Sequence, residues 1–92
     1  MKVIKFSASW CMPCAIFAKV VEAVSAEDEF KDIEFKTIDV ESEEGVELSE
    51  KYHVRNIPYT VILNDKEEVL NVVVGSISKM AFEEKLREAK SK

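Results

Sequence analysis

The chain has 92 residues, enough for one hydrophobic core and too few for two, so we expect a single domain over residues 1–92. Hydrophobic residues make up 47% of the chain and charged residues 34%, a balance that excludes a disordered protein. The formal net charge is −5 and the basic residues are scattered among acidic ones, so we expect no nucleic-acid partner.

The first half of the chain alternates between strand and helix patterns. β-Branched and aromatic residues over 3–8 predict a strand, and helical spacing of apolar residues over 16–24 predicts a helix. Alternation over 33–40 predicts a second strand, which closes a βαβ unit. Residues 43–52 read as a short polar helix, although Gly45 weakens its first turn.

The second half of the chain predicts a hairpin and a last helix. Two strands over 59–63 and 69–74 are joined by the polar, turn-rich segment 64–68, so they should pair antiparallel. Gly75 ends the second of them, and Ser78 can cap a helix that follows. The predicted order is β-α-β-α-β-β-α, an α/β fold.

The apolar runs are short, such as 61–63 and 72–74, against the roughly 20 residues that cross a bilayer, so we expect no membrane association. Strand-like residues begin at Val3, which leaves no room for a secretory signal and predicts a cytoplasmic protein. In that reducing compartment a structural disulfide between Cys11 and Cys14 is disfavoured, so we expect the two thiols to carry out chemistry.

Cys11 and Cys14 stand where the first strand passes into the first helix. Helical positions i and i+3 lie about 5–6 Å apart, and a disulfide requires Cα atoms about 4.4–6.8 Å apart, so this pair can close and reopen. A helix that begins at Cys11 would stabilise its thiolate, so Cys11 should attack and Cys14 should resolve. Pro13 fits the first helical turn and stiffens it, and Trp10 can shield one side of Cys11.

Two other roles for the cysteines remain open at this point. They could be small core residues, or half of a metal site. A metal site requires about four ligands, and apart from these thiols the chain offers only His53, so it would have to be shared between two copies. We expect no metal and no cofactor within one chain.

Three stretches resemble the thioredoxin family. Ala8 to Cys14 is similar to the active-site stretch with Trp-Cys-Gly-Pro-Cys, Tyr52 to Pro58 resembles the segment ending in Ile-Pro-Thr, and Val74 to Lys79 resembles Val-Gly-x-x-Ser-Lys. The resemblance implies a minimal thioredoxin fold, a four-stranded mixed sheet flanked by three helices. It also implies a monomeric thiol–disulfide oxidoreductase that reduces protein disulfides and receives electrons from a thioredoxin reductase or from glutathione.

The resemblance further implies a substrate rim around the cysteines. In the family the proline that corresponds to Pro58 follows a cis peptide bond and faces the cysteines, which would leave the backbone of Ile57 free to pair with a substrate strand. A glycine at position 75 would let a partner backbone approach closely. The substrate-binding residues implied are Trp10, Met12, Pro13, Ile57, Pro58 and Gly75.

The chain departs from the family pattern at several positions. The family's first strand and helix have no counterpart, so the chain resembles a glutaredoxin-sized version of the fold. Met12 replaces the usual glycine and Tyr59 the usual threonine. Lys5 stands where the family has a buried aspartate, and Phe35 where it has a lysine. We expect Lys5 to point toward the cysteine pair, to lower the thiol pKa values and to make the protein less reducing.

Two other functions compete with a thioredoxin-type reductant. A glutathione-dependent, glutaredoxin-like reductase is favoured by the short chain and the missing aspartate. Against it, Asn56-Ile57-Pro58 and Gly75-Ser76 replace the Thr-Val-Pro and Gly-Gly segments of glutathione-binding relatives. A non-catalytic binding module is the other alternative, and the intact C-x-x-C pair argues against it.

Overall fold

Eight elements follow one another along the chain, and the computed structural model describes all of residues 1–92. They are β1 (Lys2–Ser7), α1 (Met12–Ser25), the 3-10 helix η1 (Asp28–Phe30), β2 (Glu34–Asp39), α2 (Glu43–Lys51), β3 (Tyr59–Leu63), β4 (Val69–Val74) and α3 (Lys79–Lys90). The predicted order of strands and helices is confirmed, and η1 is the one element that the sequence pattern did not predict. No helix is both long enough and apolar enough to span a membrane.

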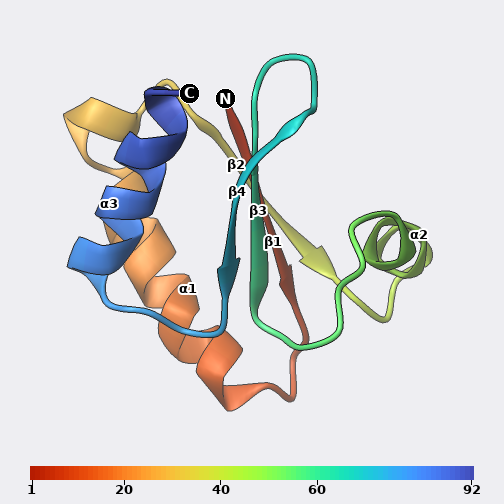
Figure 1. Cartoon of the computed structure of the whole chain (residues 1–92). Helices are drawn as coiled ribbons and strands as arrows, with labels where there is room; N and C mark the ends of the chain where they lie inside the picture. Colours follow the sequence, from red (N-terminus) through yellow and green to blue (C-terminus); the bar gives the residue numbers. More distant parts are fainter.

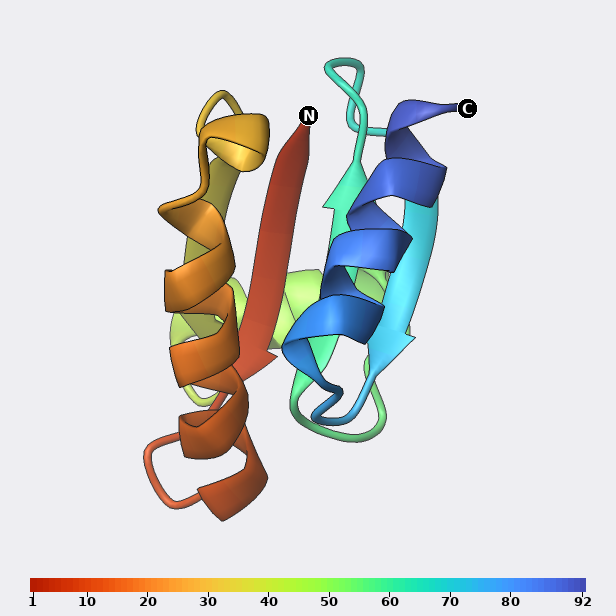
Figure 2. The same ribbon diagram turned by 90° about the vertical axis from the view of Figure 1, so that its left-hand side faces the viewer.

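The four strands form one mixed sheet in the order β2-β1-β3-β4 (Figure 1). β1 pairs in parallel with β2 and antiparallel with β3, and β3 and β4 form an antiparallel hairpin. The ribbon views place α1 and α3 on one face of the sheet and α2 on the other (Figures 1 and 2). The predicted fold, a four-stranded mixed sheet flanked by three helices, is therefore confirmed.

Each face of the sheet has its own hydrophobic core, because alternate residues of a strand point to opposite faces. On the face covered by α1 and α3, Val3 packs with the buried rings of Phe17, Phe30 and Phe82. Phe17 and Phe82 meet edge to face with ring centroids 5.2 Å apart, which joins α1 to α3. The cluster on the α2 face consists of Ile4, Phe6, Ile38, Val61 and Leu63. β1 contributes to both cores, so the loop that follows it starts from a fixed position.

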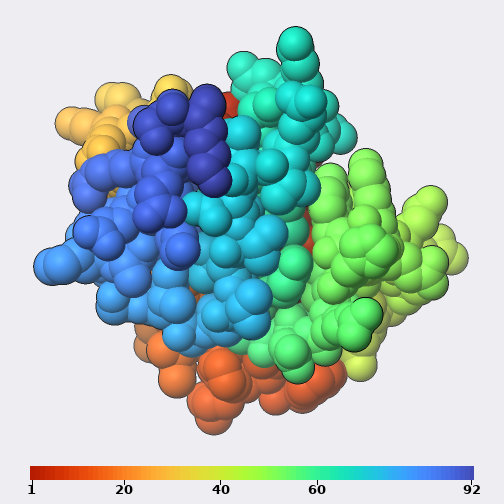
Figure 3. Space-filling model, in the orientation of Figure 1, coloured from red at the N-terminus to blue at the C-terminus, as the bar shows by residue number.

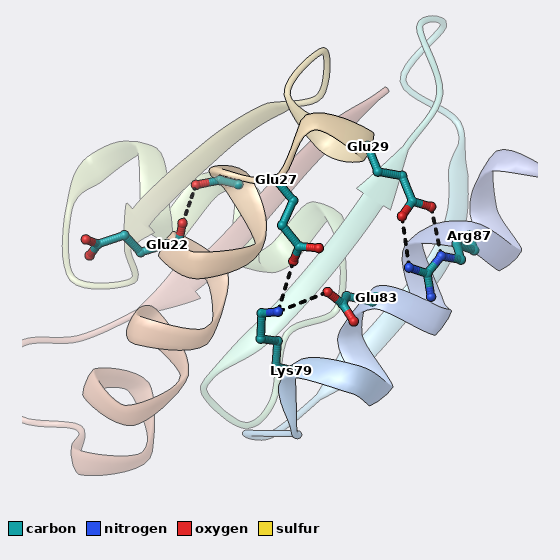
Figure 4. A network of polar contacts seen from close by, with 7 residues as sticks. Glu22, Glu27, Glu29, Lys79, Glu83 and Arg87 are labelled. Atoms are coloured by element: carbon teal, nitrogen blue, oxygen red, sulfur yellow. Dashed lines mark hydrogen bonds and ion pairs between the residues drawn. The ribbon is translucent and has the colours of Figure 1, made fainter.

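Ion pairs join the segment after α1 to α3 (Figure 4). Arg87 donates two hydrogen bonds to the Glu29 carboxylate, at 2.8 and 2.9 Å. Lys79 Nζ lies 3.3 Å from a carboxylate oxygen of Glu27 and 3.3 Å from one of Glu83. The hydrogen bond between the two carboxyl groups raises the pKa of Glu27 and lowers the pKa of Glu83. These contacts hold the loop that carries η1 against α3, about 20 Å along α1 from its N-terminus.

Gly45 lies in the first turn of α2 and is buried against the end of β2. A Cβ atom at this position would collide with the Asp39 carbonyl oxygen and the Val40 Cα atom. Ser42 caps the helix, and its hydroxyl oxygen accepts a hydrogen bond from Gly45 N–H at 2.9 Å. The sequence interpretation treated Gly45 as a weakness of the helix, whereas the structure uses the missing side chain to bring α2 onto the sheet.

Candidate active site

The cysteine pair lies beyond the C-terminal end of β1, where the chain enters α1. Cys11 and Cys14 form a disulfide with their Cα atoms 5.2 Å apart, within the range that the spacing predicted. Cys11 is the N-cap of α1, and its Sγ accepts a hydrogen bond from the Cys14 N–H at 3.2 Å. The helix itself starts at Met12, one residue after the position expected from the sequence.

The two cysteines differ in burial. Cys14 is 1% exposed, whereas Cys11 is 6% exposed. Both pack with Ala8, and the half-buried side chains of Val40 and Ile57 close the cluster. The Ile57 carbonyl oxygen lies 3.9 Å from Cys11 Sγ. Cys11 is therefore the more exposed of the two residues.

The N-terminus of α1 is electrostatically positive at Cys11. The first turn carries no acidic side chain, so nothing offsets the unpaired N–H groups and the positive end of the helix dipole. Pro13 stands in this turn, as predicted, where the absence of its N–H costs nothing. When the disulfide is reduced, the Cys14 N–H and the helix dipole favour a thiolate at Cys11.

The segment before β3 faces the cysteines from another part of the chain. The Ile57–Pro58 peptide bond is cis, as the resemblance implied, and the Ile57 N–H makes no hydrogen bond within the backbone. Gly75 N–H donates to the Pro58 carbonyl oxygen at 2.8 Å. Gly75 has φ +81, which favours glycine, and a Cβ there would have no neighbour within 4 Å. The cis peptide bond at Pro58 agrees with the resemblance, and the role of Pro58 and Gly75 in substrate binding stays a prediction.

Apolar side chains are exposed beside the pair. Trp10 is 67% exposed and Met12 71% exposed. The Trp10 indole N–H donates to a carboxylate oxygen of Glu41 at 3.2 Å, which restrains the ring. In the space-filling view the orange-red surface of the loop before α1 and of the start of α1 lies at the lower edge of the molecule, next to the green surface of the segment that leads into β3 (Figure 3).

A cleft of about 220 Å³ lies next to Trp10, and the sequence did not predict it. Three separate parts of the chain line it: the loop before α1, the end of β2, and the stretch from α2 to the cis peptide. Its lining residues are Trp10, Val40, Ser49, Val54, Arg55 and Ile57. The sequence signals were that Trp10 lies within the first stretch that resembles the thioredoxin family, and Val54, Arg55 and Ile57 within the second.

The comparisons with known proteins agree on one family. A family model described as Thioredoxin matches residues 1–88. The chain belongs to the thioredoxin family. The thioredoxin of Buchnera aphidicola subsp. Acyrthosiphon pisum is 38% identical over 85 residues, which cover 92% of this chain and 75% of that protein. The thioredoxin of Mycoplasmoides gallisepticum is 36% identical over 85 residues, covering 92% of this chain and 80% of that protein.

Solved structures support the same assignment. Thioredoxin NaTrxh from Nicotiana alata has a TM-score of 0.82 at 30% identity and covers 96% of this chain and 71% of that chain. Thioredoxin from Trypanosoma brucei brucei has a TM-score of 0.81 at 25% identity and covers 99% of this chain and 75% of that chain. With its C-x-x-C pair at disulfide distance, this thioredoxin-family member is a thiol–disulfide oxidoreductase that reduces protein disulfides as an electron carrier. Membership implies protein disulfides as substrates and a reductase as partner.

Lys5 is the main departure from the thioredoxin pattern. It lies in β1, is 4% exposed, and pairs in register with Thr37 of β2 and Thr60 of β3. Lys5 is two residues after Val3 in β1, so both side chains lie on the face of the sheet that α1 and α3 cover. No hydrogen bond or ion pair reaches its ammonium group, and burial lowers the pKa of Lys5. The Thr60 hydroxyl beside it is also buried without a hydrogen-bond partner.

Proposed function

We propose that Cys11 is the attacking thiolate and Cys14 the resolving thiol in the reduction of protein disulfides, within one monomeric domain that acts in the cytoplasm. The observation that carries the assignment of roles is the position of Cys11 at the N-cap of α1, where the Cys14 N–H donates to its sulfur. Cys14 is one turn further along the helix and more deeply buried, which suits a thiol that reacts only with Cys11.

The reaction balances in two exchange steps. The Cys11 thiolate attacks one sulfur of the substrate disulfide, a mixed disulfide forms, and the other substrate sulfur leaves as a thiolate and takes up a proton. Cys14 then loses its proton and attacks Cys11 Sγ, which releases the second substrate thiol. The substrate disulfide gains two electrons, and the protein is left with the Cys11–Cys14 disulfide.

The substrate binds, in this proposal, across a rim made of Trp10, Met12, Pro13, Ile57, Pro58 and Gly75. The free N–H of Ile57 supports this, because an extended substrate segment can pair with it in the manner of strand addition. The exposed apolar side chains of Trp10 and Met12 add contact area beside the reacting sulfur.

Electrons reach the oxidised pair from a flavoprotein thioredoxin reductase rather than from glutathione. The match to thioredoxins over nearly the whole chain supports this choice. Comparing the rates at which thioredoxin reductase with NADPH and glutathione reduce the Cys11–Cys14 disulfide tests it. Faster reduction by glutathione would favour the glutaredoxin-like alternative.

Two cysteine variants test the assigned roles. We expect Cys11→Ser to abolish reduction of a peptide disulfide, and Cys14→Ser to attack and then stall as a mixed disulfide with the peptide. Mass spectrometry of the protein after incubation measures the trapped species. Equal trapping by both variants, or trapping only by Cys11→Ser, would contradict the roles proposed here.

A further inference from the structure

The cleft beside Trp10 has a composition suited to one side chain of a substrate. Its volume of about 220 Å³ is below the roughly 300–1,000 Å³ of pockets that enclose small-molecule ligands. Most of its lining is apolar, from Trp10, Val40, Val54 and Ile57. Ile57 also places its carbonyl oxygen 3.9 Å from Cys11 Sγ, so a segment bound at Cys11 runs directly past the cleft.

Two polar groups of the cleft have no partner within the protein. The Ser49 hydroxyl is buried and makes no hydrogen bond. Arg55 is exposed, and no carboxylate lies within ion-pair distance of its guanidinium, although the chain has 18 acidic residues. Arg87, the other arginine, donates hydrogen bonds from Nε and Nη2 to the two carboxylate oxygens of Glu29. An unpaired arginine and a buried unpaired hydroxyl in one cleft are free to bind an acceptor supplied by another molecule.

We infer that this cleft selects substrate proteins carrying an Asp or Glu side chain next to the reactive cysteine, with Arg55 pairing with the carboxylate and Ser49 donating a hydrogen bond to it. Arg55 and Ser49 are then specificity-determining residues for the proposed reduction of protein disulfides, on which this inference rests. Glu41, an exposed acidic residue, is bound to the indole N–H of Trp10 and makes no ion pair with Arg55.

The net charge of the chain makes the selection of an acidic substrate side chain depend on Arg55. The net charge of −5 repels acidic partners at long range, so an acidic segment is accepted only where a local cation offsets it. Arg55 is the one charged residue that lines the cleft. A basic substrate segment would place like charge beside Arg55, which disfavours it.

The test uses peptides with a disulfide that differ only in having Glu, Gln or Lys beside the reactive cysteine. For the reduced wild-type protein we expect kcat/KM to be about two- to fivefold higher for Glu than for Gln, the size typical of an exposed charge pair, and lowest for Lys. Arg55→Gln should bring the ratio of Glu to Gln close to one, and Arg55→Lys should restore part of it. Ser49→Ala should lower kcat/KM for the Glu peptide more than for the Gln peptide.

Lys66→Gln is the matched control, because it removes the same charge from the exposed turn between β3 and β4, away from the cysteines (Figure 1). At each salt concentration used in the assay, the ratio of kcat/KM for the Glu peptide to that for the Gln peptide should be the same in Lys66→Gln as in the wild type. Equal kcat/KM for Glu and Gln in the wild type, or an unchanged ratio in Arg55→Gln, would overturn the inference while leaving disulfide reduction intact. A loss of the ratio in Lys66→Gln would show that net charge alone governs the choice. Failure of the wild type to reduce any peptide would instead contradict the proposed function.

Discussion

Replacing Lys5 by methionine should stabilise the folded protein. Lys5 is 4% exposed and makes no hydrogen bond or ion pair, so the folded state holds an ammonium group that has lost much of its water. Methionine keeps a similar length and removes the charge. Replacing buried charged groups by apolar ones of similar size often stabilises by about 1–4 kcal/mol, and after a discount for solvent screening we expect about 1–2 kcal/mol at neutral pH.

The same substitution should change how stability depends on pH. Burial lowers the pKa of Lys5 from 10.5, so between the lowered value and 10.5 the unfolded chain binds more protons than the folded one. Stability from this group therefore rises with pH across that window. Lys5→Met lacks this contribution, so its advantage over the wild type should shrink as the pH approaches 10.5. Urea unfolding at several pH values measures both quantities.

A second substitution, Lys5→Asp, tests the effect of Lys5 on the cysteines. If the Lys5 ammonium group stays within about 8 Å of the sulfurs, at an effective dielectric constant near 20, it favours a thiolate by roughly 2 kcal/mol, and screening halves this. The two-electron potential of the wild type should therefore lie roughly 20–40 mV above that of a protein without this charge. Lys5→Asp should raise the thiol pKa values and make the potential more negative, with Lys5→Met in between.

Unchanged thiol pKa values and an unchanged potential in both variants would refute the electrostatic role of Lys5. A lower free energy of unfolding for Lys5→Met, or an advantage that persists near pH 10.5, would refute the reasoning about burial. The redox prediction and the stability prediction can be refuted independently. The redox prediction depends on the electrostatic field of Lys5 at the sulfurs, and the stability prediction depends on the solvation of its amine. Lys5→Met keeps the redox test available even if a buried aspartate prevents folding.

Three further substitutions test the packing around the site. Gly45→Ala should lower the free energy of unfolding by about 1–3 kcal/mol, because the new methyl group overpacks against Asp39. Helix propensity alone would favour alanine by about 1 kcal/mol. Equal stability of the variant and the wild type would show that α2 shifts freely. Gly75→Ala should cost about 1–2 kcal/mol from its φ of +81 alone, because no atom lies within 4 Å of the new Cβ; denaturant unfolding measures it. Arg87→Gln should slightly lower the free energy of unfolding near neutral pH. The difference from the wild type should vanish as the pH falls through the lowered pKa of Glu29, because the charge pair stabilises the fold only while Glu29 is ionised. A difference in the free energy of unfolding that persists in acid would contradict this.

Local sequence patterns predicted most of the fold because this chain forms its structure largely from segments with a clear period. The hairpin over Tyr59–Leu63 and Val69–Val74 was found with its bounds, and Ser78 caps α3 as predicted. The 3-10 helix Asp28–Phe30 was missed, because a single turn leaves no periodicity; Phe30 is buried in a core that also includes residues far away in the sequence, such as Val3 and Leu86. The value of Gly45 was also missed, since the collision it avoids is with the end of β2.

The cysteine pair could be predicted from the sequence because its geometry is local. Spacing of three along a helix fixes the Cα separation of Cys11 and Cys14, which is 5.2 Å. The cleft could not be predicted, because Ser49 and Arg55 meet Trp10 only after α2 has packed on the sheet. The environment of Lys5 could be predicted in part. Strand alternation predicts the face of the sheet on which its side chain lies, but only the register of β1 with β2 and β3 shows that no carboxylate lies beside it.

The contacts that hold the molecule together differ in kind from those around the cysteine pair. The hydrogen bonds between Arg87 and Glu29 lie beyond the C-terminal end of α1, whereas the cysteines lie at its start. At the active site, by contrast, the hydrogen bonds that set the geometry come from the backbone, as from Cys14 N–H to Cys11 and from Gly75 N–H to Pro58. Side chains such as Met12, 71% exposed, are therefore free to vary without disturbing the position of the sulfurs. With the roles proposed above, changes in the cleft and in the exposed rim would alter partner choice, while the exchange chemistry depends on the start of one helix.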